Sequence, residues 1–350
     1  MKNRAIINIL SVLLCITMLL PLAACTSDEP VQTQLFAMDT MMSLTAYGKN
    51  AQAGIDSATG IIKSMDKALD PKSQDSVVSL INRAEGNDVI VPVQVAEMLR
   101  TAMSVNYKSK GALDLSIYPI YLAWGEFKEE TARIPEADEL KELVHNLHFD
   151  EASLTRFPGE SSYSFKIPAG TQISFGAVAK GCASNYAIEA MKDAGVESGI
   201  VSLGGNVQTL GIKPDGSNWT VAVEDPNNPG AYLGTLSVGE TAVITSGNYQ
   251  RYFKGEDGEK YHHIIDPDTG RPVENNLLSV TIICKDGTLA DCLSTAMFVL
   301  GEKGALQYWR DNGGFEMIMV TDENQVICTS GLIEIFQLTN TDDYTATMLE

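Results

Sequence analysis

The sequence predicts an α+β fold, a single compact domain of mixed helices and antiparallel-rich sheet. Three observations lead to this prediction. The first half of the 350-residue chain carries apolar stripes at helical spacing, the part from Gly199 onward alternates short β-rich runs with turns, and no regular βαβ repeat appears. The sequence contains no internal repeat, low-complexity segment or clear linker, so one domain is expected.

Helices are expected mainly in the first half of the chain. The clearest spans 52–69, where apolar residues recur at helical spacing. Asp75-Ser76 can cap a short helix that runs through Ala84. Further helices are expected at 93–107, 136–147, 178–194 and 287–300.

Strands are expected at 41–47 and then throughout the second half of the chain. Residues 156–166 are predicted to form a loop and a strand. In the second half, β-rich runs separated by turns predict strands at 200–203, 219–223, 242–245, 278–284, 317–320 and 333–338.

The first 25 residues resemble an export signal. Lys2 and Arg4 precede the apolar run Ile6–Leu20, and Leu22-Ala23-Ala24-Cys25 follows it. This ending resembles a lipobox, in which Cys25 is acylated and becomes the first residue of the mature protein. The alternative is a plain signal peptide with an incidental cysteine. The cysteine at the cleavage point and the polar stretch behind it favour a lipoprotein.

These features divide the chain into three parts. We expect a lipoprotein signal peptide at 1–24, a tether at 25–35 and one catalytic domain at 36–345. The expected location is the cell membrane, where the lipid anchor would hold the protein at the extracytoplasmic face.

Charge and cysteine content exclude two classes of function. The net charge is −20, and it becomes −22 once Lys2 and Arg4 are removed with the signal peptide. So acidic a chain repels nucleic acid, and no nucleic-acid partner is expected. The cysteines after Cys25 form no CxxC pair or Cys/His cluster, which argues against zinc. Cys182 and Cys292 fall in helix-like stretches and are expected to be core residues.

The segment Asp291-Cys292-Leu293-Ser294-Thr295 is the strongest local signal. Asp291 and Thr295 are four residues apart, which places them on one face of a helix. A carboxylate and a hydroxyl stacked in this way suit Mg²⁺, which prefers oxygen ligands. The alternative is an acid favoured by the helix dipole and a threonine that bonds back to a carbonyl. On this segment alone the alternative is favoured.

The segment Ser174–Gly181 predicts a phosphate site. Its small residues precede a helix start, which favours anions, and Lys180 adds a positive charge. The spacing is not that of a Walker loop. Tight helix packing with a solvated Lys180 explains the segment equally well.

Tyr261–Gly270 contains two of the four histidines of the chain, at the end of an apolar run that leads into a Pro/Gly turn. A neutral histidine there can act as a general base. A surface histidine pair is the commoner alternative.

Two weaker signals are glycine-containing. Leu203-Gly204-Gly205-Asn206 lacks the G-x-G-x-x-G spacing, so a Rossmann fold is not indicated. The two glycines can serve a bulge or the close approach of a ligand. Ala112-Leu113-Asp114 follows a glycine, and its acid can accept hydrogen bonds from a ligand or belong to an ordinary turn.

The order of these signals along the chain resembles the FAD:protein FMN transferases, the ApbE family, over about Met38 to Gly301. Seven segments in sequence carry the resemblance, namely Met38–Thr40, Gly111–Asp114, Gly176–Gly181, Leu203–Asn206, Thr245–Asn248, His263–Gly270 and Asp291–Thr295.

The resemblance implies roles by position. It implies a Mg²⁺ site made by the backbone carbonyl of Ala177 with Asp291 and Thr295, and Ser294 as a further contact. His263 matches the catalytic base. The positions that match FAD contacts are Met38, Ala112, Leu113, Asp114, Lys180 and Ile265.

Two positions depart from the family pattern. Many members have an aspartate where Ser174 stands and another where Asn185 stands. Ser174 can still hydrogen-bond to the nucleotide, so it is retained as a candidate FAD contact. An aromatic residue expected near Leu69–Pro71 is not evident.

The resemblance also implies the reaction and the partners. FAD is the substrate, and FMN passes to a Ser or Thr hydroxyl in a short motif of an exported or membrane acceptor protein, with release of AMP. Two alternatives remain, a Mg²⁺-dependent FAD diphosphatase and a flavin-binding lipoprotein without turnover. A carrier needs neither metal nor base, so Asp291, Thr295 and His263 together argue against it.

Overall fold

The computed structural model describes residues 29–157 and 162–349. The expected signal peptide and the candidate lipidation site Cys25 lie outside these ranges.

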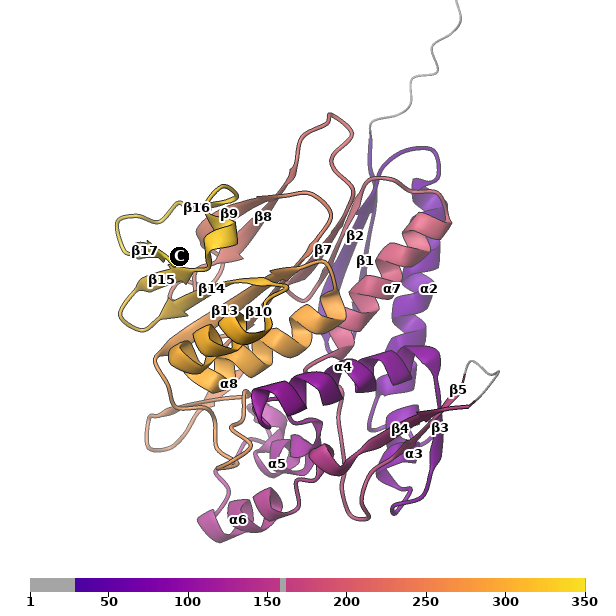
Figure 1. Ribbon diagram of the computed structural model, residues 1–350, viewed down its shortest axis with the longest axis vertical. Coiled ribbons are helices and arrows are strands. Elements are labelled where there is room, and N and C mark those ends of the chain that lie inside the picture. Colours follow the sequence, from indigo (N-terminus) through magenta and orange to yellow (C-terminus); the bar gives the residue numbers. More distant parts are fainter. Residues whose placement is uncertain (1–28, 158–161, 350) are drawn as a thin grey trace, which may run out of the picture.

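A nine-stranded sheet forms the centre of the molecule (Figure 1). Its neighbouring strands are antiparallel, except that β15 and β17 are parallel. In spatial order the strands are β1 (Val31–Ala37), β2 (Thr40–Ala46), β6 (Gly199–Leu203), β7 (Asn206–Leu210), β10 (Ala242–Gly247), β13 (Leu277–Cys284), β14 (Glu316–Thr321), β15 (Gln325–Cys328) and β17 (Thr345–Met348).

Three helices cover one face of this sheet, and a fourth packs against two of them, as Figure 1 shows. The three are α2 (Ala51–Leu69), α7 (Ala179–Asp193) and α8 (Gly287–Asn312), and the fourth, α4 (Val93–Ser109), packs against α7 and α8. The apolar stripe of α2, from Ile55 to Leu69, is buried against α7 and the sheet. Burial of such stripes from helices and strands makes the main hydrophobic core.

A smaller sheet covers part of the opposite face. It contains β8 (Trp219–Glu224), β9 (Tyr232–Val238) and β16 (Phe336–Leu338), with β9 in the middle. Alternate residues of β8 and β9 are buried and form a second core with the outer side of β10, β13 and β14. The large sheet is therefore buried on both faces over these strands.

The remaining elements lie at one end of the sheet, at the bottom of Figure 1. They include a three-stranded sheet and a third core around Ile120, Trp124 and Ile265. The elements are α3 (Val77–Asn82), β3 (Val89–Pro92), η1 (Leu115–Ile117), α5 (Tyr118–Ala123), η2 (Gly125–Phe127), α6 (Ala137–His145), η3 (Phe149–Glu151), β4 (Ser153–Arg156), β5 (Ser162–Lys166), β11 (Tyr252–Lys254) and β12 (Lys260–His262); η4 (Ser330–Leu332) lies near the C-terminal strands.

The α+β prediction is confirmed, and most predicted elements lie within one or two residues of the observed ones. The predicted cap of the second helix is correct, because the Ser76 hydroxyl accepts a hydrogen bond from the Ser79 N–H at 3.1 Å. Cys182 and Cys292 are fully buried in α7 and α8, as expected of core residues.

Three boundaries were wrong. Residues 31–35, expected to be tether, belong to β1, which pairs with β2 along its whole length from Val31 opposite Ala46. Strand β17 extends the folded part to Met348, beyond the expected end at residue 345. In the segment 333–338 only Phe336–Leu338 is strand. Short polar strands at a sheet edge carry little apolar alternation, which is why β1 resembles a linker.

The last helix is longer than expected. It runs to Asn312, but Gly301 inside it has a φ of 66°, so the helical geometry is interrupted one residue after the predicted end. Within residues 29–157 and 162–349, no helix is both long enough and apolar enough to cross a membrane.

Candidate active site

Two hairpin turns meet at one end of the large sheet. Met38 and Asp39 connect β1 to β2 with φ values of 48° and 56°, and Gly204 and Gly205 connect β6 to β7. The Gly204 N–H donates to the Met41 carbonyl at 3.2 Å. A Cβ atom on Gly204 would lie 2.5 Å from the Thr40 hydroxyl oxygen, so only glycine fits this contact.

The turn that carries Met38 is also tied to helix α2. The Met38 N–H donates to the Asp66 carboxylate at 2.7 Å. This hydrogen bond holds the backbone of Met38, a candidate FAD contact. The partly buried Met38 side chain takes no part in it.

The Asp291 carboxylate lies between helix α7 and strand β7. Its Oδ2 accepts a hydrogen bond from the Gly181 N–H at 2.8 Å, and its Oδ1 accepts one from the Asn206 side-chain amide at 2.9 Å. Asp291 is only 4% exposed. The helices approach closely here, because a Cβ on Gly181 would lie 2.1 Å from the Gly287 carbonyl oxygen.

Hydroxyl groups from α8 and β10 gather beside Asp291. Ser294 Oγ donates to the Asp291 carbonyl at 2.9 Å, and Ser246 Oγ lies 2.8 Å from Ser294 Oγ and 3.4 Å from Thr295 Oγ1. The structure thus brings the predicted metal positions Asp291, Ser294 and Thr295 together. Ser294 is fully buried and bonded to protein atoms, whereas Thr295 is partly exposed and so remains more accessible as a ligand.

Ala177 lies in the turn that leads into α7, four residues before Gly181. The hydrogen bonds of this turn run from Val178 and Ala179 to the Phe175 carbonyl and from Cys182 to the Val178 carbonyl. The Gly181 N–H donates to Asp291, so the first turn of α7 contacts the Asp291 carboxylate. The carbonyl of Ala177 lies in the same turn.

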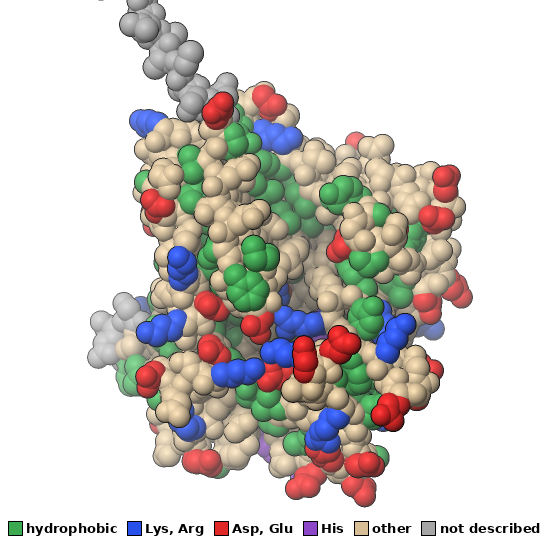
Figure 2. Space-filling model, turned by 180° about the vertical axis from the view of Figure 1, so that it is seen from behind, with side chains coloured by type: hydrophobic (Ala, Val, Ile, Leu, Met, Phe, Trp, Pro, Cys, Tyr) green, Lys and Arg blue, Asp and Glu red, His purple; other side chains and the backbone are tan. Residues whose placement is uncertain are grey.

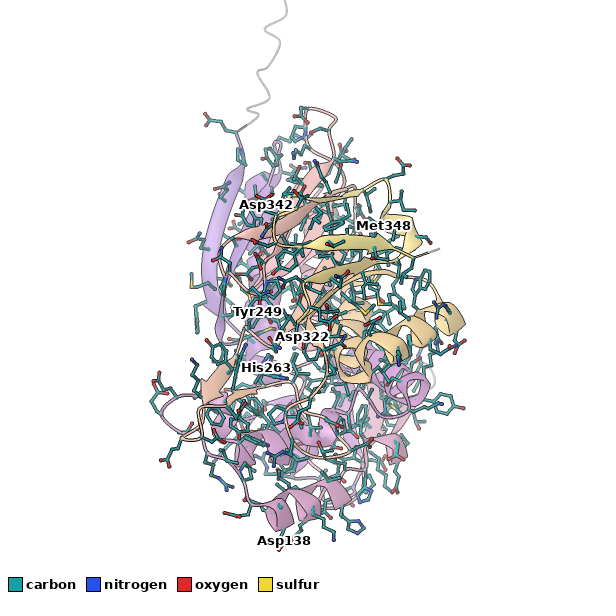
Figure 3. The ribbon with its side chains drawn as sticks, turned by 90° about the vertical axis from the view of Figure 1, so that its left-hand side faces the viewer. Asp138, Tyr249, His263, Asp322, Asp342 and Met348 are labelled. Carbon is teal, nitrogen blue, oxygen red and sulfur yellow. The ribbon has the colours of Figure 1, made fainter. Side chains whose placement is uncertain are left out.

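His263 follows β12, and Figure 3 shows it below Tyr249, between the strands of the large sheet and the layer that carries Asp138. The Arg251 carbonyl accepts hydrogen bonds from the His263 backbone N–H at 3.0 Å and from ring Nδ1 at 3.1 Å. Since a carbonyl oxygen only accepts, Nδ1 carries the proton and Nε2 has a free lone pair.

The ring of His263 is partly exposed yet packed among protein atoms. Burial, with smaller contributions from the positive charges of Arg251 and Lys180, lowers the pKa of His263 to about 3, although the hydrogen bond to the Arg251 carbonyl opposes this shift. His263 is therefore neutral near pH 7. The ammonium group of Lys180 is therefore close enough to lower the pKa of His263.

His262, unlike His263, is buried and has hydrogen-bond partners for both ring nitrogens. It is 6% exposed, its Nε2 lies 3.1 Å from the Val273 carbonyl, and its Nδ1 accepts from the Ile264 N–H at 3.3 Å. Its ring packs edge-on against Phe298. Burial lowers the pKa of His262 to about 4. Both ring nitrogens are occupied, so His262 is a core residue.

Asp114 and Ser174 lie on neighbouring segments, because the Ser174 N–H donates to the Leu115 carbonyl at 3.0 Å. Asp114 Oδ1 accepts from the Ser116 N–H at 2.7 Å and from its hydroxyl at 2.6 Å, which caps η1. Burial raises the pKa of Asp114, and these two hydrogen bonds lower it. Asp114 is thus a turn carboxylate, and within residues 29–157 and 162–349 its hydrogen bonds end on one oxygen, Oδ1.

Two predicted FAD contacts are core residues. Leu113 is 1% exposed, and Ile265 is 2% exposed beside Ile120 and Trp124. Their side chains pack inside the protein, so any ligand contact at these positions is restricted to backbone atoms. Ala112, in the turn before them, is partly exposed.

Three residues beside the predicted site were not predicted from the sequence. Asn206 and Ser246 lie inside the quoted segments Leu203–Asn206 and Thr245–Asn248, which was the available signal. Arg251 left no signal, because it holds His263 through its backbone carbonyl.

Basic side chains gather at the lower end of a hollow on the face turned away from the viewer in Figure 1, as Figure 2 shows. A separate cavity of about 630 Å³ opens beside α4, α7 and the start of α8. Its lining includes Asn185, Gln208 and Asp286 but none of the predicted site residues. The predicted site therefore does not coincide with this cavity.

The α+β fold, a buried carboxylate beside hydroxyl groups and a neutral histidine are features of a single-domain enzyme. A family model described as the ApbE family matches residues 38–319. The chain belongs to the ApbE family, as the order of its sequence segments indicated.

Curated relatives and solved structures agree with this assignment. The chain is 28% identical to a FAD:protein FMN transferase of Treponema pallidum, over 95% of this chain and 96% of that one. It is 30% identical to one of Klebsiella pneumoniae, over 77% and 83%. The ApbE protein of Thermotoga maritima superposes with a TM-score of 0.76 at 27% identity, covering 84% of this chain and 95% of that one. Pseudomonas stutzeri flavinyl transferase ApbE in its apo form gives 0.72 at 28%, covering 84% and 92%.

Proposed function

We propose that this chain transfers the FMN half of FAD to a Ser or Thr hydroxyl of an exported or membrane protein, with Mg²⁺ and with release of AMP. The observation that carries the proposal is the state of His263. Its Nδ1 is held by the Arg251 carbonyl and its ring is neutral, so Nε2 is able to take a proton.

The residues around Asp291 fit Mg²⁺. Asp291 is a buried carboxylate whose two hydrogen bonds leave lone pairs on both oxygens, and the partly exposed Thr295 hydroxyl lies one turn further along α8. The described residues contain no cluster of three or more His, Cys, Asp or Glu side chains. A single carboxylate with neutral oxygen groups suits Mg²⁺, which keeps waters and binds substrate phosphates.

Asp291, Thr295 and the Ala177 carbonyl would hold the ion. When bound, Mg²⁺ would neutralise the negative charge that develops on the diphosphate oxygens during transfer. The remaining contributions come from the chain itself. Lys180 at the start of α7 and the helix N-terminus would attract the phosphate groups of FAD.

His263 would supply the proton transfer. Nε2 accepts the proton of the acceptor hydroxyl as its oxygen forms a bond to the FMN phosphorus. The bond between that phosphorus and the bridging oxygen breaks, and AMP leaves with the bridging oxygen. The Arg251 carbonyl holds the Nδ1 proton throughout, which orients the ring.

One experiment separates this proposal from its alternatives. The mature protein is incubated with FAD, Mg²⁺ and a candidate exported acceptor, and AMP and the mass of the acceptor are measured. AMP with an FMN-modified acceptor supports the transferase. AMP with free FMN identifies a FAD diphosphatase, and unchanged FAD identifies a flavin-binding protein.

We further propose that Cys25 anchors the protein by a lipid to the extracytoplasmic face of the cell membrane. The Leu22–Cys25 ending behind an apolar run supports this. Cys25→Ser should remove lipid labelling and release the protein from membranes. Unchanged labelling in that variant would contradict the anchor.

A further inference from the structure

Asn206 carries a buried side-chain amide that donates a hydrogen bond to Asp291. It is the first residue of β7, directly after the Gly204–Gly205 turn, and it is 2% exposed. Its Nδ2 donates to Asp291 Oδ1 at 2.9 Å across 85 residues of sequence. A buried amide and a buried carboxylate are both costly without partners, so each stabilises the other.

The two donors to Asp291 restrain the carboxylate in different ways. The Gly181 N–H binds Oδ2 from helix α7, and Asn206 binds Oδ1 from strand β7. Rotation of the carboxylate about its Cβ–Cγ bond would break both hydrogen bonds. The Gly181 donor belongs to the backbone, whereas the Asn206 donor is a side chain that a substitution can remove.

The position of Asn206 is itself fixed by the Met38 turn. Gly204, two residues earlier, donates to the Met41 carbonyl at 3.2 Å and packs against Thr40 without room for a Cβ atom. Asn206 therefore connects the turn that carries the candidate FAD contact Met38 to the Asp291 carboxylate.

We propose that Asn206 is a positioning residue that sets the orientation of Asp291 for a divalent cation. The inference rests on the proposed function, in which Asp291 is the charged ligand. Residues that hydrogen-bond to a metal ligand typically change metal affinity about 10- to 100-fold when they are removed. Removal of the Asn206 side chain should weaken metal binding by a factor in that range.

Gln208 provides a matched control. It lies two residues further along β7 on the same face, it is 5% exposed, and it is also a buried amide. Its Oε1 accepts from the Ser184 hydroxyl at 2.6 Å, and its Nε2 donates to Asn185 Oδ1 at 2.7 Å. Gln208 thus bonds to the same helix as Gly181 without taking part in the hydrogen bonds of Asp291.

The test measures metal binding without FAD. Asn206→Ala, Gln208→Ala and the unchanged protein are titrated with Mn²⁺, followed by the loss of the free-ion electron paramagnetic resonance signal, and then competed with Mg²⁺. Mn²⁺ accepts the same oxygen ligands as Mg²⁺. Asn206→Ala should bind both ions about 10- to 100-fold more weakly. Gln208→Ala should differ from the unchanged protein by less than about threefold, although both variants should lose thermal stability.

Several outcomes would overturn the inference. Unchanged metal affinity in Asn206→Ala, or equal losses in both variants, would make Asn206 a structural residue only. If Asn206→Ala does not fold, Asn206→Ser replaces it, because its hydroxyl is too short to reach Asp291 and the same loss is expected. An unchanged protein that binds neither ion would instead contradict the metal part of the proposed function.

Discussion

The contact between α7 and α8 has two ends, and they differ in how completely their polar groups are bonded. At one end the Asn185 side chain uses all of its hydrogen-bonding capacity. Its Nδ2 donates to Asp286 at 2.6 Å and to Thr288 at 3.0 Å, and its Oδ1 accepts from Gln208 at 2.7 Å and from the Gly287 N–H at 2.8 Å. At the other end the Asp291 carboxylate accepts from Gly181 and Asn206 and keeps further lone pairs.

This difference leads us to propose the Asp291 end as the one that binds a ligand. The 630 Å³ cavity opens at the Asn185 end, where the amide has no lone pair or N–H left for a ligand. Asp291 lies outside that cavity and retains capacity to bind a cation. Spare bonding capacity and open volume therefore favour opposite ends of this contact, and the proposed function follows the bonding capacity. Asn185 joins the two helices.

The same contrast separates the two neighbouring histidines. His262 uses both ring nitrogens in the core, whereas His263 uses one, and its Nε2 has no hydrogen-bond partner within residues 29–157 and 162–349. In each pair, the residue with unused bonding capacity is expected to act on a ligand, and the fully bonded residue is expected to stabilise the fold. The following substitutions test this expectation.

Asp291→Ala should have the largest effect. It removes the only carboxylate proposed to hold Mg²⁺, and with it several kcal/mol of charge stabilisation, so Mg²⁺-dependent AMP release should fall by about 10³-fold or more. Circular dichroism should show that the fold survives. A rate equal to that of the unchanged protein at limiting Mg²⁺ would contradict the site.

His263→Ala should slow single-turnover AMP release by about 10²- to 10⁴-fold, the usual contribution of a general base. FAD affinity should change little. His262→Ala should leave the rate of the folded protein nearly unchanged. Equal, small effects at both positions would remove His263 from the mechanism.

The pH dependence of the rate tests the same assignment. An unperturbed histidine titrates near 6.5, but burial lowers the pKa of His263 to about 3. Because the base is active when neutral, the rate should hold below pH 6.5 and fall only as the pH drops toward the lowered pKa. An acid limb near 6.5 that disappears in His263→Ala would show that the bound ligand restores an ordinary pKa.

Thr295→Ala should be milder than Asp291→Ala, because a water molecule can replace one hydroxyl on Mg²⁺. We expect a loss of about tenfold in AMP release at low Mg²⁺, which added Mg²⁺ should restore. A loss as large as that of Asp291→Ala, unaffected by Mg²⁺, would mean that Thr295 acts in another way.

His262 should affect stability and not catalysis. Burial lowers its pKa to about 4, so between pH 6.5 and 4 the unfolded chain binds more protons than the folded protein. Its contribution to the free energy of unfolding is fully present above about pH 6.5 and is lost as the pH falls toward 4, by about 3 kcal/mol. Urea unfolding of His262→Gln at high and low pH should show a smaller decrease than the unchanged protein.

Asn185→Ala, like His262→Ala, should have little effect on the rate. It breaks four hydrogen bonds and should lower the free energy of unfolding by about 1–3 kcal/mol, as expected when buried groups lose their partners. AMP release per folded molecule should stay within about twofold of the unchanged protein. A large loss of rate with an intact fold would contradict the proposed contrast between the two ends.

Sequence alone determined the features that depend on neighbouring residues. Apolar spacing predicted α2 nearly residue by residue, and Ser76 predicted the cap of α3. Asp291 and Thr295 were placed on one helix because helical periodicity is a local property. The ordered segments predicted the family. Each of these inferences uses short stretches of chain.

Only the tertiary structure decided which groups meet. The bonds from Asn206 and Gly181 to Asp291 span 85 and 110 residues, and the partner of His263 is a backbone carbonyl, which has no sequence signature. Packing also placed Leu113 and Ile265 in the core and paired β1 with β2. These outcomes depend on how distant elements pack, because burial and hydrogen bonding are properties of the whole fold.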